Sequence, residues 1–189
     1  MKLNLQAVVI GVSAGGFQAL HTLLPLFPKT FLPPIIIVQH RMADSDDFFV
    51  DSLNKCCQLL VKEPDDKEKI RSGTVYIAPA GYHLFIEKNR TFSLSLDEPV
   101  RYSRPSIDVL FEAGAAVYKT NLAGVILTGA NADGSNGIKT IKDHGGLTVA
   151  QDPETAEIAT MPRSAIKTDA VDFILSLEDI PQFLSGLME

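Results

Sequence analysis

One serine lies in the pattern that most clearly suggests chemistry in this sequence. Ser13 is the central residue of Gly11–Gly15, which matches G-x-S-x-G. In that motif the serine sits on a strained turn between a strand and a helix. The apolar run Ala7–Ile10 precedes the turn and a helical pattern follows it. The free N–H groups at the start of such a helix favour an oxyanion beside the serine oxygen, so the pattern indicates a nucleophile.

A phosphate-binding loop is the alternative interpretation of the same turn, because glycine-rich strand-to-helix turns commonly hold phosphates. Gly11, Ser13 and Gly16 imitate only part of G-x-G-x-x-G, since a serine replaces the second glycine. A dinucleotide site also needs an acidic residue at the end of the second strand. The chain has Gln39 and His40 there. This weakens the nucleotide hypothesis without removing it.

A general base for the serine is expected among four histidines. His40 follows the β-branched run Ile35–Val38, at the carboxyl end of a strand expected beside the serine strand. His21 lies within the first helix, His83 begins a hairpin strand, and His144 lies at a helix C-terminus, where a cation is favourable without a catalytic role. Position therefore favours His40 as the base.

The third partner should be a carboxylate that orients the imidazole. Asp133 lies in a glycine-flanked loop after the expected strand Leu122–Leu127, although it could instead cap the next helix. Asp152, Asp108 and Asp44 are rivals by the same logic, and Asp152 is the strongest of them because it also follows a strand end. The residues alone favour Asp133 only slightly.

Composition and charge limit the class of protein to which this chain can belong. The chain has 189 residues, 46% of them hydrophobic and 21% charged, which predicts one globular domain over residues 1–189. A net charge of −6 argues against a general nucleic-acid binder. With neither a secretory signal nor an apolar run of about 18 residues, we expect a cytoplasmic protein without membrane insertion. The adjacent Cys56 and Cys57 predict neither a disulfide nor a zinc site.

Strands and helices alternate along almost the whole chain, which predicts a doubly wound α/β fold with a mostly parallel sheet. We expect strands at Ala7–Val12, Ile35–Val38, Gln58–Lys62, Thr74–Ala78, Leu122–Leu127, Leu147–Gln151 and Val171–Leu175, and an antiparallel hairpin at Leu84–Glu87 and Thr91–Leu96. We expect helices at Ala14–Leu26, from Asp44 or Ser45 to Asn54, and at Ser106–Tyr118, Ser135–His144, Met161–Ile166 and Ile180–Leu187. The three polar loops after the first, second and Leu122–Leu127 strands would then meet at one edge of the sheet.

Six motifs in order resemble those of the catalytic domain of the chemotaxis protein-glutamate methylesterase (CheB-type) family. They are Gly11–Gly16, Val38–His40, Val75–Pro79, Arg104–Phe111, Leu127–Gly129 with Asp133–Gly134, and Met161–Ile166. The resemblance covers about residues 8–177, nearly the whole chain. Six ordered motifs are far more specific than any one of them.

The resemblance implies a serine hydrolase with a Ser13, His40 and Asp133 triad and an acyl-enzyme. It implies an oxyanion hole that includes the backbone N–H groups of Ala14 and Ala130. Members of the family demethylate glutamate methyl esters on the cytoplasmic helices of methyl-accepting chemoreceptors, and also deamidate glutamines there. The family needs no cofactor and no metal.

Three departures from the family pattern bear on regulation and docking. The family usually carries an N-terminal receiver domain, whereas this chain starts at the catalytic domain, so we expect control by a separate receiver or methyltransferase protein. A Gly-Met-Gly loop is replaced by Gly129, Ala130 and Asn131, and the loop at Arg41–Asp44 differs where the family tends to have prolines. The altered loop leaves open a catalytically weak or inactive receptor-docking module of the same fold.

Overall fold

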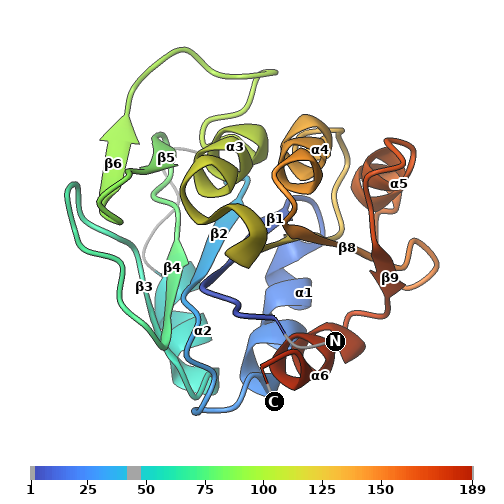
Figure 1. Cartoon of the computed structure of the whole chain (residues 1–189), viewed down its shortest axis with the longest axis horizontal. Helices are drawn as coiled ribbons and strands as arrows, with labels where there is room; N and C mark the ends of the chain where they lie inside the picture. Colours follow the sequence, from blue (N-terminus) through green and yellow to red (C-terminus); the bar gives the residue numbers. More distant parts are fainter. Residues whose placement is uncertain (1–2, 42–47, 189) are drawn as a thin grey trace.

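A seven-stranded parallel sheet forms the centre of the molecule in the computed structural model, which describes residues 3–41 and 48–188 (Figure 1). Its strand order is β3-β4-β2-β1-β7-β8-β9, and β5 and β6 form a separate antiparallel pair. The strands are β1 (Ala7–Val12), β2 (Ile35–Gln39), β3 (Leu60–Lys62), β4 (Thr74–Ile77), β5 (His83–Ile86), β6 (Phe92–Ser95), β7 (Leu122–Ile126), β8 (Leu147–Gln151) and β9 (Phe173–Leu175). The predicted α/β fold with its hairpin is confirmed.

Helices cover both faces of the sheet (Figure 1). One face carries α1 (Gly16–Leu23), α2 (Phe48–Cys56) and α6 (Asp179–Gly186), and the other carries α3 (Ile107–Tyr118), α4 (Ser135–Asp143) and α5 (Thr160–Ile166). Short 3₁₀ helices extend α1 at Leu24–Leu26 and α3 at Lys119–Asn121. Because both faces are covered, β1, β2 and β7 are buried along their whole length, which explains why their sequences are almost entirely apolar.

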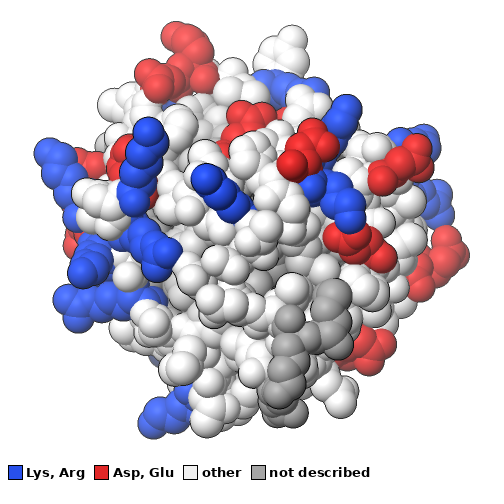
Figure 2. All heavy atoms as spheres, in the orientation of Figure 1, with Lys and Arg blue, Asp and Glu red and all other residues white. Residues whose placement is uncertain are grey.

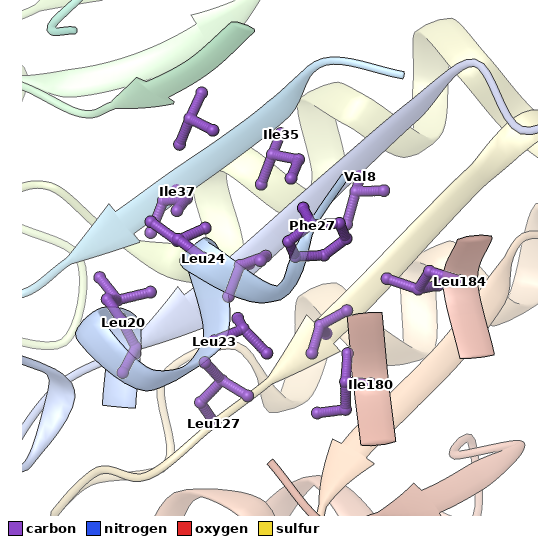
Figure 3. Close-up of a cluster of buried hydrophobic side chains, with 14 of the residues drawn as sticks. Val8, Leu20, Leu23, Leu24, Phe27, Ile35, Ile37, Leu127, Ile180 and Leu184 are labelled. Atoms are coloured by element: carbon purple, nitrogen blue, oxygen red, sulfur yellow. The ribbon is translucent and has the colours of Figure 1, made fainter. Parts of the chain in front are cut away.

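Two apolar cores lie on opposite sides of the sheet, and β1 contributes to both because successive side chains alternate. Val8 and Ile10 belong to the core that includes side chains of α1, β2 and α6. Figure 3 shows Val8 in this core. Ala7 and Val9 belong to the opposite core, beneath α3 and α4. The central strand is thus fixed from both sides, which holds the turn after it in place.

The ends of several predicted elements shift by one to three residues. Helix α1 begins at Gly16 rather than Ala14, because Gly15 adopts a left-handed conformation with φ of 78° and turns the chain into the helix. Strand β9 begins at Phe173 rather than Val171. The predicted cap of the second helix, at Asp44 or Ser45, lies outside the described residues.

The order of the strands brings three loops to one edge of the sheet. Strand β1 pairs with β2 on one side and with β7 on the other, so the direction of strand succession reverses at β1. Ligands of open parallel sheets bind beyond the carboxyl ends of the strands at such a point. Val12 is paired with Gln39, and Gly11 with Ile126. The loops that carry Ser13, His40 and Asp133 therefore start from neighbouring strand ends.

Charged side chains are unevenly distributed over the face shown in Figure 2. Lys and Arg gather along the left side, over the edge of the sheet that carries β3 and the β5–β6 pair, and much of the lower middle is uncharged. Among the described residues, no helix combines the length and apolarity that crossing a membrane requires.

Candidate active site

Three side chains from distant parts of the chain form one hydrogen-bonded line. The Nδ1 atom of His40 lies 3.2 Å from Oγ of Ser13, and its Nε2 atom lies 2.9 Å from Oδ2 of Asp133. The side chain of Asp133 is 1% exposed and that of His40 is 14% exposed. The line thus runs from a buried carboxylate to a partly exposed hydroxyl, and the three residues predicted to form a triad lie together.

The orientation of the His40 ring defines which nitrogen can act as a base. An ionised carboxylate only accepts hydrogen bonds, so Nε2 carries the proton that is donated to Asp133. In the neutral form of the imidazole, Nδ1 is then the acceptor that faces the Ser13 hydroxyl. In the chymotrypsin-type arrangement the two nitrogens have the opposite assignments. The chemistry is the same, because a free lone pair points at the hydroxyl.

The N-terminus of α3 holds the Asp133 carboxylate. The N–H of Ile107 donates to Oδ2 at 2.7 Å, and the N–H of Asp108 donates to Oδ1 at 3.1 Å. The Ser106 hydroxyl and the N–H of Gly134 also donate to Oδ1, at 3.1 and 3.0 Å. Free N–H groups and the helix dipole favour an anion at a helix N-terminus. The carboxylate is therefore fixed in both position and charge.

These contacts set the pKa of Asp133. Burial raises it, but the hydrogen bonds from His40 and from the N–H groups of Ile107 and Asp108 outweigh burial, and the pKa lies below the usual carboxyl value. Asp133 is consequently ionised at neutral pH and keeps Nε2 of His40 protonated.

Gln39 links the serine loop to the histidine loop. Its Nε2 donates to the carbonyl oxygens of Ser13 at 2.9 Å and of His40 at 3.1 Å. Its Oε1 lies where a side chain at position 16 would project: a Cβ on Gly16 would be 1.9 Å from it. A side chain at position 16 would therefore displace Gln39, which contacts the two loops that carry Ser13 and His40.

The backbone N–H groups of Ala14 and Ala130 are the predicted oxyanion-hole donors. Within residues 3–41 and 48–188, neither the N–H of Ala14 nor that of Ala130 donates a hydrogen bond. The two loops are tied together, because the Thr128 hydroxyl donates to the Ala14 carbonyl at 2.9 Å and the Ser13 N–H donates to the Thr128 carbonyl at 3.0 Å. The predicted oxyanion-hole positions therefore come from two connected turns.

The rival carboxylates serve other contacts. Oδ1 of Asp108 accepts the N–H of Gly137 in α4 at 2.7 Å, and Oδ1 of Asp152 accepts the N–H of Glu154 at 2.9 Å within its own turn. Asp44 lies outside the described residues. Of the candidate carboxylates that the structure describes, Asp133 is the one that contacts His40.

The other histidines have structural partners. His21 contacts the Phe17 carbonyl at 2.8 Å, and His144 contacts the carbonyl of the residue four positions earlier, also at 2.8 Å. Buried His83 accepts the Ser106 N–H at 3.3 Å and contacts the Glu98 carbonyl at 3.1 Å, so it anchors the start of α3. Its place in a hairpin strand was predicted from the sequence, but its contact with the helix that holds Asp133 was not.

Asn131 also reaches His40, which sequence reasoning missed. Its Nδ2 lies 3.4 Å from Nδ1 of His40, and its Oδ1 accepts the N–H of Asp133 at 3.0 Å. The available signal was an asparagine at a position where the resemblance expects glycine. From the sequence, that asparagine indicates only an altered loop.

Two surface hollows flank His40. One, of about 580 Å³, is lined by Ser13, Phe17, Gln39 and Glu157 among others. The other, of about 300 Å³, lies between His40, Arg41 and the segment 102–105. Among the described residues, Ser13 and His40 thus line the larger hollow, and His40 also lines the smaller one.

Known proteins resemble this chain over almost its whole length. The sequence model of the CheB methylesterase family matches residues 8–184. A protein of Leptospira interrogans is 57% identical over 185 residues, which are 98% of this chain and 96% of that protein. The protein-glutamate methylesterase/protein-glutamine glutaminase of Clostridium acetobutylicum is 37% identical over 177 residues, and the match spans 51% of its length.

A solved structure has the same fold. The crystal structure of the Thermotoga maritima CheB methylesterase catalytic domain superposes with a TM-score of 0.93 and is 35% identical in sequence. The match covers 97% of this chain and 98% of that domain. The chain therefore corresponds in extent to a catalytic domain.

Proposed function

Because the chain belongs to the CheB methylesterase family, we propose that it hydrolyses glutamate γ-methyl esters with Ser13 as the nucleophile. The observation that carries this proposal is the line of hydrogen bonds from Ser13 through His40 to Asp133. The proposed substrate is a methyl-accepting chemoreceptor-type protein, and the same site deamidates glutamines of that protein.

The first half of the reaction forms an acyl-enzyme. Oγ of Ser13 attacks the ester carbonyl carbon while Nδ1 of His40 takes the hydroxyl proton. The N–H groups of Ala14 and Ala130 stabilise the oxyanion. The C–O bond to the methoxy group then breaks, His40 returns the proton to the departing oxygen, and methanol leaves. Asp133 stabilises the imidazolium throughout without itself becoming protonated.

The second half releases the product. A water molecule attacks the γ-glutamyl ester on Ser13 while His40 takes one of its protons. The bond to Oγ breaks, the proton returns to Oγ, and the glutamate side chain leaves as a carboxylic acid, which releases its proton to the solvent. With a glutamine substrate, ammonia replaces methanol in the first half. These steps require neither a metal nor a cofactor.

The proposed partner places the reaction in the cytoplasm, since the methylated helices of such receptors lie there. The receptor helices would dock across the hollows that flank His40. A separate receiver or methyltransferase protein is the proposed source of regulation.

Methanol release tests the proposal. Wild-type protein and a Ser13→Ala variant are incubated with a methylated chemoreceptor cytoplasmic fragment, and methanol is measured. We expect the variant to lose about 10⁶-fold in rate, as nucleophile removal does in other triads. Equal rates in the two proteins would remove Ser13 from the mechanism.

Labelling by a fluorophosphonate probe separates an esterase from an inactive docking module. An activated Ser13 should take the label in wild-type protein, and Ser13→Ala should not. A folded wild-type protein that takes no label and releases no methanol would indicate the docking module instead.

A further inference from the structure

We infer that Asn131 selects the leaving group, favouring a methyl ester over a glutamine amide. The inference rests on the proposed function, because it concerns the same acylation step. It starts from the amide nitrogen of Asn131, which lies 3.4 Å from Nδ1 of His40. That nitrogen of His40 is also the atom that faces Ser13, at 3.2 Å from Oγ.

The orientation of the Asn131 amide is fixed by its other contact. The N–H of Asp133 donates to Oδ1 of Asn131 at 3.0 Å. Rotating the amide by 180° would place its NH₂ group against that N–H, so two donors would face each other. The NH₂ group therefore points toward His40. Asp133 in turn is buried and held by α3, so the anchor of the amide is rigid.

The leaving atom must lie beside this NH₂ group. To deliver its proton, Nδ1 of His40 must come within hydrogen-bond distance of the leaving oxygen or nitrogen. In the resting site, Ser13 and Asn131 compete for the single lone pair of Nδ1. Once His40 is protonated, that lone pair is occupied, and the N–H of Asn131 needs another acceptor.

An ester and an amide differ in what they offer Asn131. The alkoxy oxygen of a methyl ester has two lone pairs, so it can take the proton from His40 and a hydrogen bond from Asn131 together. The amine nitrogen of the tetrahedral intermediate from glutamine has one lone pair, which must take the proton. Its two N–H groups are donors and would face the donor of Asn131. The contact therefore stabilises departure of methanol and not of ammonia.

The test compares leaving groups at one position of a chemoreceptor cytoplasmic fragment: a glutamate γ-methyl ester, the γ-methyl thioester and glutamine. Sulfur is a weak acceptor, so the thioester departs without help from Asn131. The parameter kcat/KM reports steps through departure of the leaving group. For Asn131→Ala we expect a loss of about five- to tenfold on the ester, as for one hydrogen bond, and less than about twofold on the thioester and glutamine.

The control is Asn136→Ala, on the exposed surface of α4, which should leave all three rates unchanged. Equal losses on all three substrates would overturn the inference, because an oxyanion-hole or purely structural role predicts that result. An unchanged ester rate would overturn it as well.

A second variant, Asn131→Asp, tests the inference even if Asn131→Ala fails to fold. It keeps the side-chain volume and the acceptor for the Asp133 N–H, but it presents an acceptor where the donor was. Its thermal unfolding should match wild type, and its ester-to-glutamine ratio of kcat/KM should fall below that of Asn131→Ala. A wild-type ratio would contradict the inference. Wild-type turnover that survives Ser13→Ala would instead overturn the proposed function itself.

Discussion

At the residue scale, Asp133 is the most constrained side chain of the site, since an imidazole, a hydroxyl and three backbone N–H groups all donate to it. Asp133→Asn keeps one oxygen but turns the other acceptor into a donor that faces donors. We expect a loss of about 10⁴ in kcat, measured by methanol release. Retained activity would show that the carboxylate is not needed to orient His40.

The pH dependence of stability follows from the lowered pKa of Asp133. A carboxyl whose pKa is lower in the folded state stabilises the protein above its unfolded pKa of about 4 and loses that contribution as pH falls through the lower folded value. The gap in unfolding free energy between wild type and Asp133→Asn should therefore shrink as pH falls below about 4. Urea unfolding at stepped pH measures it, and a constant gap would contradict the assignment.

The absence of a side chain at Gly16 leaves room for the Gln39 side chain, which in turn contacts the loops of Ser13 and His40. A Cβ at position 16 would be 1.9 Å from Oε1 and 2.8 Å from Cδ of Gln39, so the glutamine must move. Displacing catalytic groups by about 1 Å can cost about 100-fold in rate. We expect Gly16→Ala to lower kcat by about 10- to 100-fold in the methanol assay.

The matched control is Gly186→Ala in α6, where an added Cβ meets no atom within 4 Å. It should leave kcat unchanged and raise stability slightly, because alanine favours the helix by up to about 1 kcal/mol. Equal effects of the two substitutions on kcat would disprove the role of Gln39.

At the element scale, the contact between α3 and α4 buries a second carboxylate near the site. Burial raises the pKa of Asp108, the bond from the Gly137 N–H lowers it, the nearby charge of Asp133 raises it, and the net pKa lies above its usual value. A carboxyl with a raised folded pKa binds more protons in the folded state, so stability falls as pH rises through that range. The ionised group therefore costs stability at neutral pH.

Asp108→Asn removes that charge and keeps an oxygen to accept the Gly137 N–H. We expect a higher unfolding free energy than wild type at pH 7, and the difference should vanish below a pH of about 4. Urea unfolding at both pH values checks it. Lower stability at pH 7 would mean that the carboxylate is favourable where it lies.

Most elements could be predicted because their signals are local. The run Ile35–Val38 is apolar on both faces and became the buried strand β2, and Gly145, with φ of 79°, follows the end of α4. Element ends were less predictable. They depend on single backbone conformations such as that of Gly15, or on where pairing stops, as at β9. Neither signal is visible in composition.

The site was harder to predict, because its contacts join residues far apart in sequence. Three acidic rivals of Asp133 could not be rejected without knowing that α3 begins beside the loop after β7. The resemblance to known motifs selected Asp133. Asn131 departs from those motifs, and its contact with His40 depends on loop coordinates that no sequence pattern encodes.

At the scale of the whole molecule, the positions of the site residues depend on the packing of two helical layers against the two faces of one sheet. The turn after β1 is fixed because β1 packs into both apolar cores. One core lies between the sheet and helices α1 and α6, and the other lies between the sheet and helices α3 and α4. Alternation of strands and helices predicted two layers. The order that places β1 between β2 and β7 is set by long-range pairing.

Gly124 tests how closely α4 packs on β7. An added Cβ would be 2.5 Å from Cδ1 of Ile141 and 3.1 Å from Cδ1 of Ile138. Overpacking of this kind costs about 1–3 kcal/mol, so Gly124→Ala should lower the unfolding free energy by about that amount. Ile141→Val removes the obstructing methyl group and alone costs about 0.5–1.5 kcal/mol. Because the second change makes room for the first, the double variant should lose less unfolding free energy than the sum of the two single losses, as measured by urea unfolding.

The control is Ile180→Val, which lies in the core on the other face of the sheet. Its loss of unfolding free energy should be additive with that of Gly124→Ala. Additivity of Gly124→Ala with Ile141→Val would contradict this packing of the layer that carries α3 and α4.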